Sequence, residues 1–136
     1  MNDHVTLARG WLLKADSDLT NARRTVASTG PYDTACFHAQ QAIEKALKSF
    51  LAFHEQPIPR THDLEELARF CKGIEPLPEL SLEQLADATD YGVQIRYDLD
   101  AWPSREEASE ALAVAERVRA VVVGRLPPEA RPQSVS

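Results

Sequence analysis

The chain has 136 residues, of which 43% are hydrophobic and 26% are charged, and its formal net charge is −6. This length suits a single domain, and the apolar content is too high for a disordered chain. The negative net charge opposes a protein that coats nucleic acid through its overall electric field. Acidic residues interrupt every apolar run near the N-terminus, so we expect no signal peptide, no membrane span and a cytoplasmic location.

The first predicted helix spans about residues 5–27, where apolar side chains recur at steps of three and four. Its stripe consists of Val5, Ala8, Leu12, Ala15, Leu19, Ala22 and Val26. Residues 28–31, Ser-Thr-Gly-Pro, end this helix because glycine favours a left-handed cap and proline cannot continue the hydrogen-bond ladder. A second helix is predicted over about residues 32–54. Its wide apolar face comprises Cys36, Ala39, Ile43, Ala46, Leu47, Phe50 and Phe53.

Two proline-containing linkers, residues 56–60 and 75–78, separate a short third helix from its neighbours. We expect Thr61 to cap this helix, which should end near Gly73. Ser81 with Gln84, and Ser104 with Glu107, then form capping-box patterns that open a fourth helix to about residue 97 and a fifth to about residue 125. The predicted inward residues are Leu82, Leu85, Ala86, Thr89 and Val93 in the fourth helix, and Ala108, Leu112, Ala115, Val118 and Val122 in the fifth.

These elements predict an all-α protein, an antiparallel up-and-down four-helix bundle with one short extra helix. Residues 1–126 should form one domain. Residues 127–136 are rich in proline and polar side chains and have no apolar period, so we expect a flexible C-terminal tail. Cys36 and Cys71 have no CxxC partner, which favours reduced thiols and neither a disulfide nor a metal site.

The second predicted helix contains the most specific pattern of the chain. Residues 35–48, ACFHAQQAIEKALK, resemble the second helix of the HEPN family, named for higher eukaryotes and prokaryotes nucleotide-binding. Further matching stretches follow the family's order: residues 11–19 with Lys-Ala-Asp-Ser-Asp-Leu, residues 61–64 with Thr-His-Asp-Leu, and Arg96-Tyr97 at the end of the fourth helix. The resemblance covers roughly residues 5–125.

The resemblance implies a bundle that is often dimeric. Many family members accompany a minimal nucleotidyltransferase, others are metal-independent RNases, and a toxin–antitoxin role is possible. The RNase members resemble one another in an Arg-x4-6-His motif, from which this sequence departs. Arg96 is followed by Tyr-Asp-Leu-Asp-Ala-Trp-Pro, and His4, His38, His54 and His62 all lie outside the required range. Because the reaction needs an imidazole beside a guanidinium, we expect no RNase activity.

One face of the second helix is polar. His38, Gln41, Lys45 and Lys48 lie opposite the apolar stripe, with Glu44 on the flank. One interpretation is a solvated face in which Glu44 and Lys48 form an i,i+4 pair. The alternative, which the resemblance favours, is a face whose donors meet a nucleotide or the phosphate of a partner.

Arg96 follows the inward stripe of the fourth helix, so its guanidinium must be paired or must line a cleft. A structural bridge to Asp18 or Glu44 is as well supported as contact with a ligand. Tyr97 beside it could stack on a base or close the end of the bundle. Trp11 and Trp102 are expected in the core or in a dimer seam.

The predicted nucleotide-binding residues are therefore Arg96, Lys45, Lys48, Gln41, His38 and Tyr97, with no catalytic residue, metal or cofactor. The leading hypothesis is a non-catalytic module that binds a nucleotide or works with a minimal nucleotidyltransferase. A metal-independent RNase with a divergent active site and a purely structural dimerisation module are the alternatives. We expect a homodimer, since two-fold dimers are the commonest symmetric oligomers.

Overall fold

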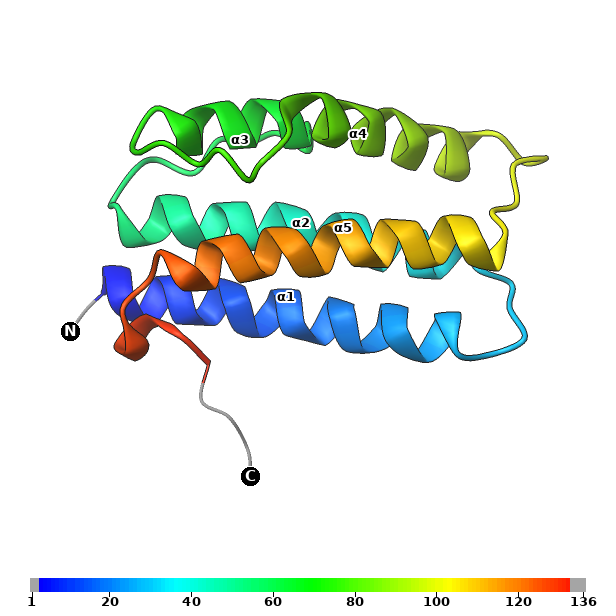
Figure 1. Ribbon diagram of the computed structural model, residues 1–136, viewed down its shortest axis with the longest axis horizontal. Helices are drawn as coiled ribbons and strands as arrows, with labels where there is room; N and C mark the ends of the chain where they lie inside the picture. Colours follow the sequence, from blue (N-terminus) through cyan, green and yellow to red (C-terminus); the bar gives the residue numbers. More distant parts are fainter. Residues whose placement is uncertain (1–2, 133–136) are drawn as a thin grey trace.

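A computed structural model describes residues 3–132 of the chain, and within them it contains helices and no strand. The helices are α1 (His4–Val26), α2 (Asp33–Phe53), α3 (Leu64–Lys72), α4 (Leu82–Tyr97) and α5 (Arg105–Gly124), followed by a short 3-10 helix, η1 (Pro128–Ala130). The four long helices alternate in direction and α3 is the short extra element (Figure 1). The predicted all-α bundle is confirmed.

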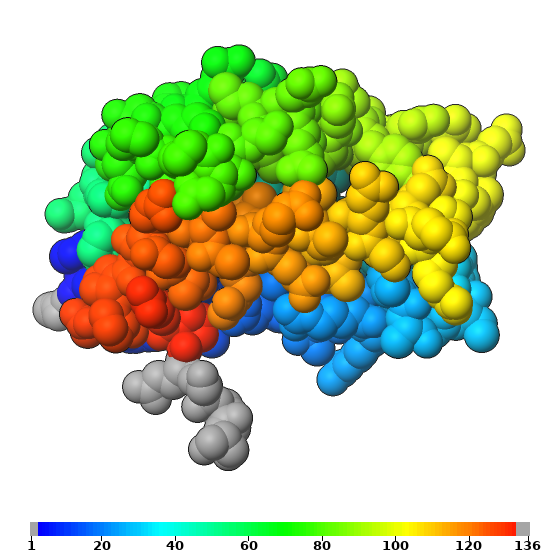
Figure 2. Space-filling view, viewed as in Figure 1, coloured from blue at the N-terminus to red at the C-terminus, as the bar shows by residue number. Residues whose placement is uncertain are grey.

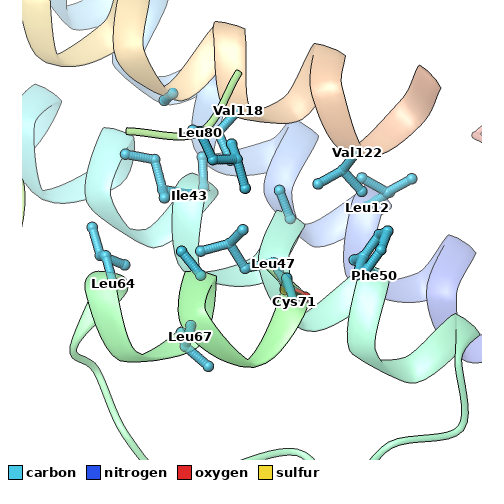
Figure 3. Packing of buried hydrophobic residues seen from close by; sticks show 14 of the residues in the cluster. Leu12, Ile43, Leu47, Phe50, Leu64, Leu67, Cys71, Leu80, Val118 and Val122 are labelled. Carbon is cyan, nitrogen blue, oxygen red and sulfur yellow. Dashed lines mark hydrogen bonds between the residues drawn. The ribbon is translucent and has the colours of Figure 1, made fainter. Parts of the chain in front are cut away.

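The second helix is the centre of the bundle. Its buried residues run from Ala35 to Ala52 and lie on nearly every side of the helix. Helices α1 and α5 pack against it, and α3 and α4 cover another side, with α4 and α5 next to each other on the face seen in Figure 2. Figure 3 shows side chains from α1, α2, α3 and α5 meeting in one core, among them Leu12, Ile43, Leu47, Phe50, Leu64, Leu67, Val118 and Val122.

The predicted stripe of α1 is confirmed, since Ala8, Leu12, Ala15, Leu19 and Ala22 are fully buried. The helix ends where expected. Gly30 has a φ of 86°, and a Cβ at this position would lie 2.9 Å from the Tyr32 ring. Glycine therefore allows both the left-handed turn and the close packing of the ring that together send the chain into α2.

Two of the three predicted helix caps are confirmed. The Ser104 hydroxyl accepts from the Glu107 backbone N–H while the Glu107 carboxylate accepts from the Ser104 N–H, a complete capping box. The Ser81 hydroxyl accepts from the Gln84 N–H. The third helix is capped by Asp63 and not by Thr61. Thr61 lies two residues before the cap position, and its hydroxyl accepts a hydrogen bond from the Asp63 N–H. This bond orients the Asp63 carboxylate, which caps the helix by accepting from the Glu66 N–H.

The predicted inward stripe of α4 is only partly correct. Of the residues of α4, all of which the structure describes, Leu85 and Gly92 alone are buried, and Val93 is 45% exposed. The reason is a close approach to α2 at Gly92, where a Cβ would lie 1.8 Å from Gln40 Oε1. Helix α4 packs against α2 at Gly92 and also against α3, so Leu82, Ala86 and Thr89 of the predicted stripe are half-buried while Val93 is exposed.

Residues 127–132 do not form the loose tail that was predicted. Ala130 in η1 is fully buried, the Arg9 guanidinium donates to the Glu129 carbonyl, and the Arg131 side chain donates to the Leu126 carbonyl. These contacts fasten the segment against α1, because η1 turns the chain back onto the bundle. The rest of the predicted tail, residues 133–136, lies outside the described residues. Among the helices of residues 3–132, none combines the length and apolar content needed to cross a bilayer.

Candidate functional site

A buried carboxylate on α1 organises the first half of the polar face. Asp18 is 7% exposed, and its two oxygens bind two side chains of α2. His38 Nδ1 lies 2.8 Å from Asp18 Oδ1, and Lys45 Nζ lies 2.6 Å from Asp18 Oδ2. His38 and Lys45 are seven residues apart on α2 and therefore lie on one side of the helix, which lets a single carboxylate reach both.

A second buried carboxylate organises the other half. Glu44 on α2 is 4% exposed, and its Oε2 accepts from Lys48 Nζ at 2.9 Å. Its Oε1 lies 2.9 Å from Nδ1 of His62, which belongs to the linker before α3 and has 76% of its side chain exposed. Lys48 also lies 5.5 Å from the centroid of the Trp11 ring. Side chains from α1, α2 and the linker therefore meet on one face.

The solvated interpretation of this face is wrong, although the predicted Glu44–Lys48 pair exists. Lys48 is only 8% exposed, and both members of the pair are buried. Both side chains are buried because neighbouring segments pack over them. Trp11 of α1 lies against the Lys48 ammonium group, and His62 of the linker before α3 contacts the Glu44 carboxylate. Ionised groups that are buried must be paired, and here each has a partner.

Arg96 is not bound by either carboxylate, so the predicted bridge to Asp18 or Glu44 is absent from the described residues. Those carboxylates are already satisfied by lysine and histidine. The Arg96 Nε donates to the Gly92 carbonyl at 3.4 Å, and its guanidinium lies 6.0 Å from the Tyr97 ring centroid. Arg96 does follow the stripe of Leu85 and Gly92, but it lies one turn beyond the last buried residue of α4. Tyr97 is 78% exposed and does not close the bundle end.

The six predicted nucleotide-binding residues fall into two groups. Because α4 runs antiparallel to α2 and Gly92 touches Gln40, Arg96 is level with the first turn of α2 (Figure 1). That places it roughly 13 Å along the helix axis from Lys45, at 1.5 Å per residue. His38, half-buried Gln41, Lys45 and Lys48 share one side of α2. Arg96 and Tyr97 form a separate group at the end of α4.

We call the first group, together with Asp18, Glu44, His62, Trp11 and Lys14, the α1–α2 face. Lys14 is exposed, makes no ion pair with any residue of 3–132, and shares a side of α1 with Trp11 and Asp18. Sequence patterns did not single out Lys14, Trp11 or His62 for this face. A signal existed for Lys14 and Trp11, whose spacing from Asp18 places all three on one side of α1. His62 had none, since its place depends on the course of the linker.

The chemistry of the α1–α2 face is that of an anion site. Each Nδ1 faces a carboxylate, which only accepts, so Nδ1 carries a proton; in the neutral ring Nε2 is then an acceptor, and the donors for an anion are the lysine ammonium groups. The face contains three lysines and two carboxylates, which give it a net charge of +1 before the histidines are counted. In a protein of net charge −6 this is a local cationic surface. Across residues 3–132 no group of three or more His, Cys, Asp and Glu side chains is arranged to hold a metal ion.

The fold and the site define a class of small up-and-down helical bundles with a polar cluster between the first two long helices. The HEPN domain model matches residues 8–126, and the chain belongs to the HEPN family. It is similar to TT1696 from Thermus thermophilus, at 31% identity and a TM-score of 0.70, over 88% of this chain and 98% of that one. It is also similar to ST0689, an archaeal HEPN homologue, at 27% identity and a TM-score of 0.63, over 87% and 96% of the two chains. No curated protein matches the chain.

Proposed function

We propose that this HEPN domain is a non-catalytic binding module that takes up a nucleotide or a phosphorylated partner on the α1–α2 face. The observation that carries the proposal is the pair of buried carboxylates, Asp18 and Glu44, which hold Lys45, Lys48, His38 and His62 in place. Because the lysine ammonium groups are already held in position, little side-chain entropy is lost when they bind a phosphate. Each lysine ammonium has three N–H donors and uses one on its carboxylate, and Lys45, whose side chain is 24% exposed, offers its remaining donors to a ligand more openly than the buried Lys48 does.

Gln41 lies between His38 and Lys45 on the same side of α2 and offers an amide donor to the same ligand. Arg96 and Tyr97 lie outside the phosphate site. Their exposed guanidinium and ring at the end of α4 suit a second contact, with a base or a partner protein, beyond the phosphate site. Anion attraction on the α1–α2 face then comes from the lysines, and Arg96 contributes to it only for a ligand long enough to span both groups.

Titration with ATP in the presence of a chelator tests this function. Removing Lys45 should weaken binding roughly tenfold, the effect of losing one charge-assisted hydrogen bond. Lys14→Ala should weaken it less, because its ammonium is exposed and screened by salt. The matched control is Arg117→Ala, which removes an exposed cation of α5 that has no ion-pair partner within residues 3–132, and it should leave the affinity unchanged. The anion site would be refuted if Lys14→Ala and Arg117→Ala lost the same amount of ATP affinity, or if the unaltered protein showed no saturable ATP binding.

An RNase with a divergent active site is a second candidate, and one observation favours it. Asp18 orients His38 through Nδ1, which leaves Nε2 free to act as a base, and the same carboxylate holds the ammonium of Lys45. An oriented base beside a cation is the minimum that RNA cleavage without metal requires. Mixed RNA incubated with the protein in chelator distinguishes the two functions. Intact RNA supports the binding module, whereas cleavage that is lost in His38→Ala supports the enzyme.

Family membership supports a partnership with a minimal nucleotidyltransferase, and the alternative is a domain that only dimerises. Where the neighbouring reading frame encodes a small nucleotidyltransferase, co-expression with that protein followed by size-exclusion chromatography separates these possibilities. A stable complex that is weakened by Arg96→Ala would support the partner role and the contact at the end of α4. Separate elution of the two proteins, together with no ATP binding, would leave dimerisation alone.

A further inference from the structure

A groove of about 550 Å³ lies between α4 and α5 and shares no residue with the α1–α2 face. The two helices lie next to each other on the face shown in Figure 2. From α4 the groove is lined by Glu83, Gln84, Asp87, Ala88 and Tyr91, and from α5 by Glu107, Glu110, Ala111 and Val114. Apart from Glu83, the positions within each helix are spaced i, i+3, i+4 and i+7, so each wall is one helix face about two turns long.

The groove is open because α4 packs against α3 and α2 and not against α5. Leu85 and Gly92, the buried residues of α4, lie seven positions apart and fix one side of the helix to the core. Gly92 brings that side against Gln40 of α2. The side that carries Ala88 therefore faces Ala111 of α5 across the groove without closing on it. The small side chains of Ala88 and Ala111, at the centre of the two walls, leave room for a third element between the helices.

The rim of the groove is acidic. Glu83 and Asp87 belong to the α4 wall, Glu107 and Glu110 belong to the α5 wall, and no lysine or arginine is among the lining residues that the structure describes. Glu107 is engaged by the Ser104 cap and by the Tyr91 hydroxyl. Glu83, Asp87 and Glu110 have no ion-pair partner anywhere in residues 3–132. Each wall thus presents unneutralised carboxylates above a narrow apolar floor.

We propose that this groove binds an amphipathic helix of a partner protein, with small apolar residues along one seam and Lys or Arg on both flanks. Two neighbouring helix faces with small residues at their centre match the way a third helix packs, ridges into grooves. The cationic flanks follow from the carboxylates on both walls, which would repel an acidic segment, a phosphate or a nucleic acid. The seam supplies the apolar burial, and the flanks fix the register of the bound helix.

A fluorescein-labelled peptide tests the proposal on the full chain by fluorescence anisotropy. The probe is about 14 residues long, which spans about 21 Å as a helix, with Ala and Leu on one seam and Lys on both flanks. We expect saturable binding. A peptide that keeps the Ala and Leu seam but has Glu in place of each Lys should not bind. A peptide with the composition of the probe but its residues in scrambled order should bind at least tenfold more weakly than the probe.

Variants of the chain locate the bound peptide. Asp87→Lys and Glu110→Lys should each weaken binding at least tenfold, whereas Glu55→Lys, which makes the same charge change in an exposed turn outside the groove, should not. Ala111→Trp fills the groove without altering its charge and should also prevent binding. Ala111→Leu is the milder version if the tryptophan variant fails to fold, as judged by circular dichroism. Loss of binding in Glu55→Lys equal to that in Asp87→Lys, or full binding by both Ala111 variants, would overturn the proposal.

Discussion

Gly92 of α4 touches Gln40 of α2 so closely that a Cβ at residue 92 would lie 1.8 Å from Gln40 Oε1. Gln40 is 6% exposed, so its side chain has little room to move aside. We expect Gly92→Leu to lower the free energy of unfolding by about 1–3 kcal/mol, since it overpacks this contact. Urea denaturation measures the change.

Gly10 is the matched control for that prediction, because a Cβ there meets nothing within 4 Å and the residue lies inside α1. Gly10→Ala should raise the free energy of unfolding by about 1 kcal/mol through helix propensity alone. Combining Gly92→Leu with Gln40→Ala should restore part of the lost stability. If Gly92→Leu is as stable as the unaltered chain, α4 does not depend on its close approach to α2.

The buried Glu44–Lys48 pair leads to a second prediction. Glu44→Ala leaves the Lys48 ammonium, whose side chain is 11% exposed, without its carboxylate, and we expect a loss of about 3 kcal/mol in unfolding free energy. The double variant Glu44→Ala/Lys48→Met should recover most of it, because no unpaired charge remains. Urea unfolding of the two single variants and the double variant forms a complete cycle. Additive losses would show that the two groups are not coupled.

The two thiols should be unreactive in the folded chain. Burial, aided by Glu107 and Asp33, raises the pKa of Cys36 from 9.0 to about 11, and burial raises that of Cys71 from 9.0 to about 12. Because the thiolate is the reactive form, a disulfide reagent at pH 8 should modify neither residue until urea unfolds the protein. Rapid modification without denaturant would contradict this burial.

The same pKa shifts predict how stability changes at alkaline pH. The folded chain keeps both thiol protons to higher pH than the unfolded chain does, so this contribution is fully present below about pH 9. It should be lost as the pH rises from about 9 toward the folded pKa values. A Cys36→Ala/Cys71→Ala variant, compared over that range by urea unfolding, should show a shallower decline. If the unfolding free energy of the variant declines as steeply with pH as that of the unaltered chain, groups other than these two thiols cause the decline.

Self-association is the last prediction. Large apolar side chains are exposed at the end of α4 and in the loop that follows, where Tyr97 is 78%, Leu99 86% and Trp102 64% exposed. Trp102 is therefore not a core residue, and a dimer seam is the remaining expectation for it. At tens of micromolar, light scattering should give the mass of a dimer for the unaltered protein. The control variant Leu7→Ser, which removes an exposed apolar side chain of α1, should also be a dimer. The variant Leu99→Ser/Trp102→Ser should give a monomer. A monomer in the unaltered protein would contradict the prediction.

Local patterns were sufficient for the helices. The stripe of α1 and the caps at Ser81 and Ser104 depend on residues within one or two turns of each other, where spacing and side-chain type decide the structure. The third helix shows the limit of such patterns. Thr61 and Asp63 are both good caps, and the course of the linker selected Asp63. The short η1 segment was missed because its stability comes from packing on α1, which no local period reveals.

The candidate site depended on contacts between distant residues. Asp18 meets His38 and Lys45 across 20 and 27 positions, and that pairing left no carboxylate for the bridge predicted for Arg96. A sequence shows which residues are charged and on which side of a helix they lie. It does not show which of several carboxylates each cation will reach, because that depends on how the helices cross. By itself the sequence determined the helices, the bundle and the family resemblance, whereas the tertiary structure alone decided that Lys48 is buried, that Arg96 is exposed, and that α4 and α5 leave a groove between them.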